Sequence, residues 1–347
     1  MIEVRNLTKK YGNFFAVNDI SFTIEKGKIY GFLGPNGAGK STTMNIITGC
    51  LSATSGSVLI DGEDIFENPL EAKRRIGYLP ELPPLYTEMT PAEYLAFIAE
   101  AKGVGYEETP RQVKEVMELT QISHVADRLI RNLSKGYRQR VGIAQALLGN
   151  PEIVILDEPT VGLDPKQIIE IRELISSLGQ TKTVIVSSHI LAEISAICDH
   201  VMIISHGRLV ANDSLAALEE SALTDTALHL TVKGEKDAVC ALLEQIEGIR
   251  GIAAQESDTV GICRFLLDMD PQNDPRDTIF YTLAEMKMPI VEMSVHHATL
   301  EDIFLRLTSE EIFDEEEADN ISSNEDYTPL FSIQEQPKNT NEEETIE

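Results

Sequence analysis

The sequence contains no tryptophan and only four cysteines among its 347 residues. The cysteines stand at Cys50, Cys198, Cys240 and Cys263, far apart and without a C-x-x-C pair. This usage argues against a disulfide framework and is typical of reduced, mostly buried thiols.

Long apolar segments are also missing. No stretch approaches the roughly 18 consecutive apolar residues of a membrane-spanning helix. The first residues, Met-Ile-Glu-Val-Arg, do not follow the charged-then-apolar order of a signal peptide. We therefore expect a soluble, cytoplasmic protein.

Basic residues are scarce: 29 Lys and Arg stand against 57 Asp and Glu, a net charge of −28. Residues 310–347 hold 14 acidic residues and one basic residue, Lys338, so they account for −13 and the preceding chain for −15. Coating of nucleic acid and direct adsorption to anionic lipid both depend on clustered Lys and Arg. The composition disfavours both.

The N-terminal part alternates in polarity. Residues 1–26 are typical of short strands, and Ser57–Asp61 is typical of another strand before an Asp-Gly turn. These segments predict an antiparallel sheet. The segment from Pro91 to about Gln121 is rich in helix-forming residues and predicts helices, the first of which begins at Pro91.

Two strands of buried type, Ile153–Leu156 and Thr183–Ser187, flank a helix predicted over Pro165–Leu178. Strands that alternate with helices predict a parallel sheet, which presents its ligands at the carboxyl ends of the strands.

The pattern changes from about Thr226. A strand, helix, strand, strand, helix and strand predict a small ferredoxin-like domain, and a final helix over Leu300–Leu307 is expected to close it. The acidic remainder is expected to be disordered. It contains an apolar island that serves either as a partner-binding peptide or as an inert segment: Tyr327, Leu330, Phe331 and Ile333. The six elements of the small domain are predicted at Ala227–Lys233, Asp237–Glu247, Ile249–Gln255, Val260–Asp268, Pro275–Met286 and Pro289–Val295.

A complete G-x-x-x-x-G-K-[ST] pattern follows an apolar run, Lys28–Leu33, and precedes a helix-like run. Glycines let backbone N–H groups wrap a triphosphate closely, and the N-terminus of the next helix adds partial positive charge. Lys40 is expected to reach the β- and γ-phosphates, Ser41 to ligate Mg²⁺ and Thr42 to add a hydroxyl. The alternative is an ordinary glycine-rich turn. The pattern consists of Gly34, Pro35, Asn36, Gly37, Ala38, Gly39, Lys40 and Ser41.

Adjacent carboxylates end the predicted strand Ile153–Leu156. Asp157 is placed to hold Mg²⁺, and Glu158 is placed to polarise the water that attacks the γ-phosphorus. The alternative is a strand end capped by solvated acids.

Between these motifs, Leu133–Arg140 reads L-S-K-G-Y-R-Q-R and leads into a helix. With this segment the chain resembles the ATP-binding-cassette (ABC) transporter ATPases, whose signature is L-S-G-G-Q. The resemblance covers Ile2 to about Leu218, and the ending Ala298–Thr308 resembles an export-type subfamily. Further motifs match in order: Tyr11 as the aromatic that stacks on adenine, Gly77–Glu81 as the Q-loop, Gly162–Asp164 as the D-loop and His189 as the switch histidine.

The resemblance implies a mechanism with ATP and Mg²⁺. Two ATP molecules lie between the phosphate loop of one subunit and the signature of the other, in a homodimer or a heterodimer with a paralogue. Closure on ATP would drive a separately encoded membrane permease, so the chain would be peripheral on the inner face of the membrane. Nucleotide contacts fall to Tyr11 and the phosphate loop through Thr42, Mg²⁺ contacts to Ser41, Asp157 and Glu81, catalysis to Glu158, His189 and Lys40, and contacts in trans to Ser134, Lys135, Gly136, Tyr137 and Asp164.

Two motifs depart from the family pattern. Glu81 stands where the family usually has glutamine, which replaces a neutral carbonyl by an anionic oxygen. Lys135 and Tyr137 replace glycine and glutamine of the signature, while Ser134 and Gly136 are retained. Tyr11 as a surface aromatic and His189 as a core histidine are the duller alternatives.

The fold class that follows is α/β: a phosphate-loop NTPase domain over residues 1–220, with a parallel core sheet, an antiparallel β subdomain and a helical subdomain. A small α+β accessory domain is expected over 226–309 and a disordered acidic tail over 310–347. Rival functions are a non-transport cassette ATPase acting on DNA or the ribosome, and a regulatory module that holds ATP without turnover. Long coiled-coil insertions or a second cassette would mark the former, and the chain has neither.

Overall fold

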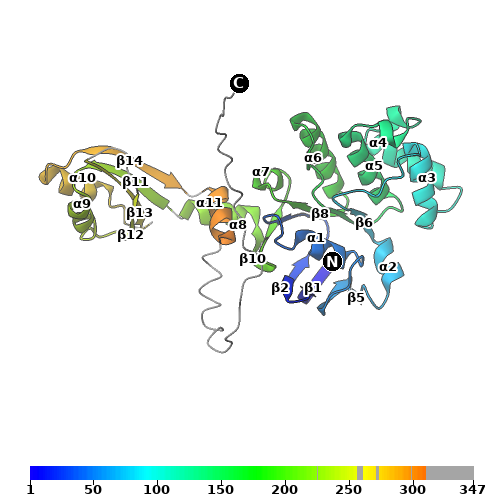
Figure 1. Cartoon of the computed structure of the whole chain (residues 1–347), viewed down its shortest axis with the longest axis horizontal. Coiled ribbons are helices and arrows are strands. Elements are labelled where there is room, and N and C mark those ends of the chain that lie inside the picture. Colours follow the sequence, from blue (N-terminus) through cyan, green and yellow to red (C-terminus); the bar gives the residue numbers. More distant parts are fainter. Residues whose placement is uncertain (225, 256–260, 271–272, 298, 310–347) are drawn as a thin grey trace, which may run out of the picture. The chain divides into compact units, whose positions relative to one another are not determined.

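A six-stranded sheet with the order β10-β9-β3-β8-β7-β6, called the central sheet below, forms the core of residues 1–224 in the computed structural model (Figure 1). The structure describes residues 1–224, 226–255, 261–270, 273–297 and 299–309. The strands from β9 to β6 pair in parallel and β10 is antiparallel to β9, which confirms the predicted parallel core. All residues of β3, β7 and β8 are buried, as expected for strands covered on both faces. The bounds are β3 Ile29–Leu33, β6 Ile76–Leu79, β7 Ile153–Leu156, β8 Thr183–Ser188, β9 His200–Ser205 and β10 Arg208–Ser214.

A second sheet has the order β2-β1-β4-β5 and is antiparallel, as predicted. A hydrophobic core joins its inner side chains to the central sheet and to α1 (Lys40–Ile47). Phe22 of β2 and Phe32 of β3 meet in it with ring centroids 5.9 Å apart. The strands are β1 Ile2–Tyr11, β2 Phe14–Ile24, β4 Ser55–Ile60 and β5 Glu63–Asp64.

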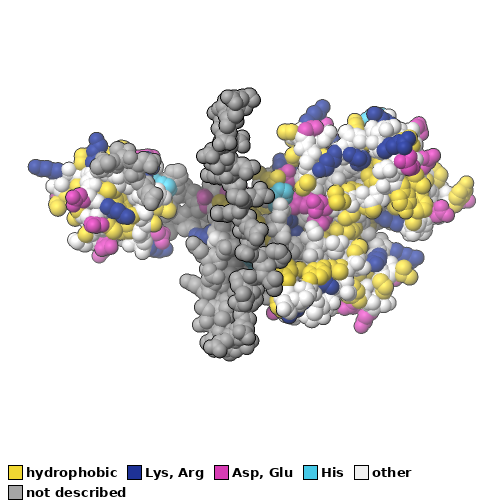
Figure 2. Space-filling model, viewed as in Figure 1, with side chains coloured by type: hydrophobic (Ala, Val, Ile, Leu, Met, Phe, Trp, Pro, Cys, Tyr) yellow, Lys and Arg dark blue, Asp and Glu magenta, His cyan; other side chains and the backbone are white. Residues whose placement is uncertain are grey.

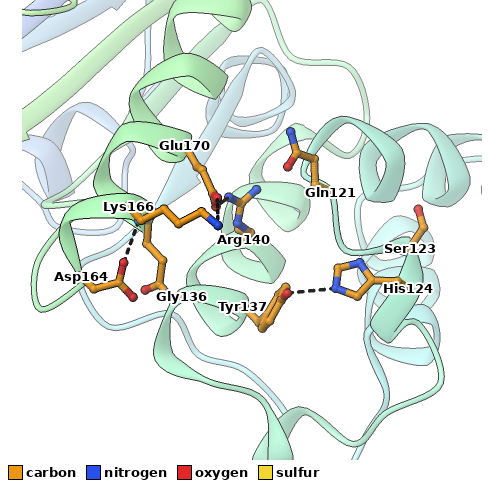
Figure 3. Close-up of a pocket in the computed structure, with 10 residues that line it drawn as sticks. Gln121, Ser123, His124, Gly136, Tyr137, Arg140, Asp164, Lys166 and Glu170 are labelled. Carbon is orange, nitrogen blue, oxygen red and sulfur yellow. Dashed lines mark hydrogen bonds and ion pairs between the residues drawn. The ribbon is translucent and has the colours of Figure 1, made fainter.

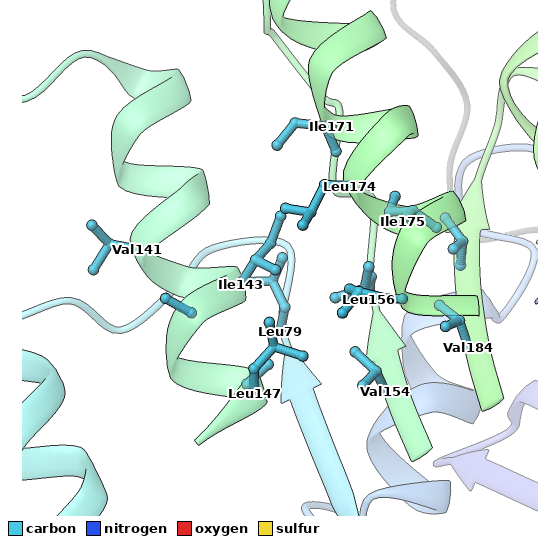
Figure 4. Packing of buried hydrophobic residues seen from close by; sticks show 14 of the residues in the cluster. Leu79, Val141, Ile143, Leu147, Val154, Leu156, Ile171, Leu174, Ile175 and Val184 are labelled. Atoms are coloured by element: carbon cyan, nitrogen blue, oxygen red, sulfur yellow. The ribbon is translucent and has the colours of Figure 1, made fainter. Parts of the chain in front are cut away.

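Helices and short 3₁₀ turns build the rest of this region. α3 begins at Pro91, as predicted, with a capping box between Thr90 and Glu93. Helices α5 and α6 pack their apolar faces on the central sheet: Leu147 of α5 lies beside Leu79 of β6, and Ile175 of α6 lies near Leu156 of β7 (Figure 4). The elements are α2 Pro69–Arg74, α3 Pro91–Ala101, α4 Thr109–Leu119, η1 Ser123–Val125, η2 Ile130–Asn132, α5 Lys135–Leu147, α6 Pro165–Gly179 and α7 Leu191–Ile194.

The third sheet has the order β12-β13-β11-β14 with antiparallel neighbours throughout. It carries α9 and α10 and a hydrophobic cluster of its own, which includes Leu228, Phe265 and Ile279. This is the predicted β-α-β-β-α-β order. The bounds are β11 Thr226–Lys233, α9 Lys236–Leu243, β12 Ile249–Gln255, β13 Ile262–Met269, α10 Arg276–Glu285 and β14 Ile290–His297.

The last helix, α11 (Leu300–Thr308), forms where it was predicted, but the predicted packing against the small domain is wrong. It contacts α7, α8 (Leu215–Thr224), β9 and β10 instead of closing the small domain. Leu300, Phe304 and Leu307 pack on the hydrophobic core that the central sheet shares with α5 and α6. The apolar stripe of α11 was visible in the sequence, but a stripe does not specify which surface covers it.

Two other expectations concern cysteines and the tail. All four cysteines are free, as predicted. Only Cys198 is buried, so the expectation of mostly buried thiols is wrong. The acidic tail 310–347 and its apolar island lie outside the described residues. Within the part of the chain that the structure describes, no helix has the length and apolarity needed to cross a membrane.

Candidate active site

The phosphate loop connects β3 to α1, and close backbone packing explains two of its glycines. Gly39 has φ 107°, and a Cβ there would lie 2.3 Å from the carbonyl oxygen of Ala16. A Cβ on Gly34 would lie 2.3 Å from the carbonyl oxygen of Ile204. Side chains at these positions would push the loop away from β2 and β9. The loop therefore keeps its shape, with its N–H groups at the start of α1, only with glycine there.

Lys40 is the first residue of α1 and is only 6% exposed. Its Nζ donates to the carbonyl oxygens of Gly34, at 2.8 Å, and Pro35, at 3.3 Å. The same ammonium lies 3.3 Å from Glu158 Oε1. Backbone carbonyls thus hold the cation beside a carboxylate that comes from another strand.

Asp157 and Glu158 follow β7, where the parallel sheet presents its carboxyl ends. The Ser187 hydroxyl donates to Asp157 Oδ1 at 2.5 Å, and the Ser41 hydroxyl lies near enough to this carboxylate to lower its pKa. Burial raises the pKa of Asp157, against the effect of these two hydroxyls. Asp157 is 2% exposed, so the alternative of a solvated strand-end acid is wrong for it.

Glu158 is 5% exposed and adopts φ 48°, in the left-handed region. Its backbone N–H donates to Ser187 Oγ at 2.8 Å. His189 follows β8, and its Nδ1 lies 3.0 Å from Glu158 Oε2. Its side chain is 37% exposed, so it is not a core histidine. Lys40, Glu158 and His189 form one connected group.

A cavity of about 520 Å³ opens over this group. It brings together most residues predicted for the nucleotide site, from five separate segments of the chain. Gly34, Pro35, Ala38 and Asp157 do not line it and instead support the residues that do. Its lining consists of Tyr11, Phe14, Ala16, Asn36, Gly37, Gly39, Lys40, Ser41, Thr42, Glu81, Glu158, Val161 and His189.

Gly136 and Tyr137 of the signature line a different cavity, also of about 520 Å³, together with Asp164 (Figure 3). Ser134 and Lys135 of the signature do not line it. Ser134 caps the N-terminus of α5 by accepting a hydrogen bond from Tyr137 N at 3.4 Å. The Tyr137 hydroxyl lies 3.0 Å from His124 Nε2. No residue lines both cavities. Within one chain the signature therefore does not complete the phosphate-loop site.

The side chain of Lys135 lies against Gly162: a Cβ on this glycine would be only 2.3 Å from Lys135 Nζ. Gly136 is packed as closely: a Cβ there would be 2.6 Å from the side-chain amide of Gln167 on α6. Asp164 caps α6 by accepting from Gln167 N at 2.9 Å. The signature and the D-loop are thus packed together within the chain.

Sequence reasoning missed two contributors. Ser187 donates to the carboxylate of Asp157 and accepts from the backbone N–H of Glu158, and its place before Ser188 and His189 at the end of a buried strand was a usable signal. Phe14 lines the nucleotide cavity, and its signal was the hairpin register, which pairs it with Tyr11.

The donor set also fits a magnesium ion. The described residues contain no group of three or more His, Cys, Asp or Glu placed to hold a metal. Mg²⁺ in nucleotide sites does not need one, because it keeps waters and binds substrate phosphates with one or two protein oxygens. The Ser41 hydroxyl and the nearby Asp157 carboxylate provide such oxygens.

Comparison with known proteins agrees with this geometry. Residues 17–161 match the family model described as ABC transporter. The chain is 35% identical over 309 residues to the bacitracin transport ATP-binding protein BcrA of Bacillus licheniformis, which covers 88% of this chain and 97% of that protein. It is 33% identical over 318 residues to the linearmycin resistance ATP-binding protein LnrL of Bacillus subtilis (strain 168), or 90% of this chain and 100% of that protein.

Solved structures show the same fold. A dimeric post-hydrolysis state of the ATP-binding cassette MJ0796, bound to ADP and Pi, matches with a TM-score of 0.57 and 28% identity, over 62% of this chain and 99% of that one. The chain belongs to the ATP-binding subunits of ABC transporters. It binds and hydrolyses ATP. Subunits of this family dimerise and pair with membrane permeases.

Proposed function

We propose that this chain is the ATPase subunit of an exporter and that Glu158 is the general base for hydrolysis. The observation that carries the proposal is the Lys40–Glu158–His189 group at the phosphate loop. Glu158 Oε1 is buried and has no hydrogen-bond partner among the described residues; its contact is the ion pair with Lys40 Nζ at 3.3 Å, so its capacity to accept a hydrogen bond is unused. Oε2 is oriented by His189.

In this proposal, the loop N–H groups and Lys40 hold the β- and γ-phosphates, with Asn36 and Thr42 beside them. Glu158 takes the proton of the attacking water, and His189 keeps the carboxylate turned toward it. Ser41, Asp157 and Glu81 would hold Mg²⁺. The ion, when bound, neutralises phosphate charge.

The adenine of ATP is assigned to the end of the β1–β2 hairpin. Tyr11 and Phe14 are direct partners across β1 and β2 and therefore project from the same face. Lys9 Nζ lies 5.2 Å from the centroid of the Tyr11 ring, so one ring face is occupied by a cation. The other face is assigned to adenine.

The second half of each site is assigned to another subunit, in a homodimer or a heterodimer with a paralogue. Support comes from the separation of the two cavities within one chain. Ser134, Lys135, Gly136, Tyr137 and Asp164 would then face the phosphates bound by the partner. If each site is shared between subunits, the altered signature takes part in hydrolysis, and the alternative of a regulatory module without turnover loses its support.

The permease is assigned to the surface after Glu81. Leu82 is 83% exposed, Tyr86 53% and Phe97 42%. Figure 2 shows hydrophobic side chains gathered on the surface around α3. An apolar patch of this kind suits a protein partner. A permease bound there would hold the chain at the inner face of the membrane. The relatives include a Nod factor export protein and a lantibiotic transport protein, which supports export; their different cargoes support assignment of cargo choice to the permease.

Residues 226–309 are proposed as an accessory domain, supported by the separate core of the third sheet. α11 is the exception, since it packs on the ATPase region.

A Glu158→Gln variant tests the proposal. We expect its kcat to fall by about 10²- to 10⁴-fold, the range for a positioned base, with ATP binding retained. Glu152→Gln, the same change on an exposed residue just before β7, is the matched control and should keep the parental rate. Hydrolysis by Glu158→Gln at the parental rate would remove the assignment. Affinity capture of tagged chain from detergent-solubilised native membranes should yield a polytopic membrane protein; ribosomal or DNA-bound partners would overturn the exporter.

A further inference from the structure

Glu193 is a buried carboxylate that does not line the nucleotide cavity. It lies on α7 and is 7% exposed. One of its oxygens, Oε2, accepts hydrogen bonds from Thr160 Oγ1 at 2.5 Å and from Ser188 Oγ at 3.1 Å. Buried carboxylates need such partners, and here both are hydroxyls.

The two hydroxyls lie beside Glu158 and His189, in the segments that follow or end β7 and β8. Thr160 is two residues after Glu158, and Ser188 directly precedes His189. These loops follow β7 and β8, which are parallel neighbours in the central sheet. Ser188 Oγ also accepts from Ile190 N at 3.0 Å, which fixes the start of α7. One oxygen of Glu193 therefore ties both loops to the same point.

The backbone conformation of Glu158 depends on the hydrogen bonds of its neighbours. A residue with a side chain adopts φ 48° only when its surroundings hold it there. Ser187 holds the N–H of Glu158 on one side. The bond between Thr160 and Glu193 anchors the chain on the other side. Without it, the turn after Glu158 loses its side-chain anchor.

We propose that Glu193 is a positioning residue for hydrolysis, which keeps Glu158 within hydrogen-bond distance of His189 by fixing both loops. The proposal rests on the assignment of Glu158 as the base. A displacement of about 1 Å can slow an enzyme by about 100-fold. Glu193→Ala is therefore expected to lower kcat by about 10- to 100-fold. KM for ATP should change little, because Glu193 does not touch the phosphate loop.

Conservative and paired variants separate positioning from general structural support. Glu193→Gln keeps a carbonyl oxygen that can accept both hydroxyl hydrogen bonds, so most of kcat should return. Thr160→Val removes one hydroxyl with little change of shape and should lower kcat as well. The double variant Glu193→Ala with Thr160→Val should show less than the product of the two separate effects, because both changes break the same bond.

Ile194→Val is the control, since Ile194 is buried on the same helix but makes no side-chain hydrogen bond in the network. It should leave kcat per folded molecule unchanged. The proposal is overturned if Glu193→Ala keeps the parental kcat, or if its lower rate is explained entirely by a smaller fraction of folded protein. It is also overturned if Glu193→Gln is as slow as Glu193→Ala, or if the fold reductions in kcat of Glu193→Ala and Thr160→Val multiply in the double variant. Glu158→Gln assayed in parallel separates the two hypotheses: an active Glu158→Gln rejects the base, whereas an inactive one beside a normal Glu193→Ala rejects only the positioning role.

Discussion

Replacement of Phe14 by leucine is expected to weaken ATP binding about fivefold without affecting the phosphate part of the site. Phe14 is 64% exposed, lines the nucleotide cavity and is the cross-strand partner of Tyr11. Stacking of a base on an aromatic side chain contributes about 1–3 kcal/mol. Leucine keeps part of the apolar contact, so we expect a loss of about 1 kcal/mol, or about fivefold in Kd.

Two ligands distinguish base from phosphate contacts in this test. The Kd of MgATP, measured by displacement of a fluorescent nucleotide, should rise in the variant. Tripolyphosphate, which has no base, should displace the probe with an unchanged inhibition constant once probe affinity is taken into account. Phe15→Leu is the matched control, because Phe15 pairs with Lys10, whose Nζ lies 4.6 Å from its ring centroid, and does not line the cavity. Unchanged MgATP binding by Phe14→Leu, or an equal weakening of tripolyphosphate, would refute the reasoning.

Two further predictions concern the phosphate loop and the fold. Gly39→Ala should abolish ATP binding in a nucleotide titration, because its Cβ would lie 2.3 Å from a carbonyl oxygen. Gly37→Ala is the control: it shares the backbone strain of a positive φ (83°, against 107° at Gly39), but its Cβ meets nothing within 4 Å, so it should retain measurable binding. Equal effects would reject the steric explanation. Burial opposes the charge on Asp61, but hydrogen bonds from the N-terminal ammonium and Lys26 outweigh it and lower its pKa to about 2. A carboxyl group whose pKa is lowered by folding stabilises the fold above its unfolded pKa near 4, and this effect is lost as pH falls toward 2. Asp61 lies at the surface, where solvent screens its ion pairs, so Asp61→Asn should cost about 1 kcal/mol in urea unfolding at pH 7 and progressively less below pH 4. A penalty independent of pH would contradict this account.

The elements predicted well from sequence are those for which local chemistry and tertiary structure agree. Pro91 follows a threonine cap, and a helix begins at Pro91 in the prediction and in the structure alike. The phosphate loop needs a strand before it and a helix after it, so Gly34–Ser41 predicted β3 and α1 together. The same holds for Asp157 and Glu158, because two acids directly after a buried apolar strand lie at the carboxyl end of a parallel sheet, where ligands bind.

The errors concern contacts between distant segments. Glu193 was omitted from the prediction altogether: in the sequence S-H-I-L-A-E it has the pattern of a solvated helix charge, and only the adjacency of β7 and β8 shows that Thr160 faces it. The destination of α11 and the exposure of Cys50 depend in the same way on which surfaces meet. Periodicity specifies that a face is buried, but not its partner.

The return of α11 to the ATPase region changes how the third sheet is attached. The chain enters this sheet from α8 and leaves it into α11, and these two helices contact each other. The sheet is therefore an insertion with two anchored ends and not an appendage on one linker. A truncation after residue 220 would remove Leu300, Phe304 and Leu307 from the core that Leu215 and Leu218 also pack against, and a single proteolytic cut between β14 and α11 would leave both fragments joined by noncovalent packing. Any movement of this sheet must pivot about a pair of neighbouring helices, which restricts it to fewer directions than a flexible tether allows.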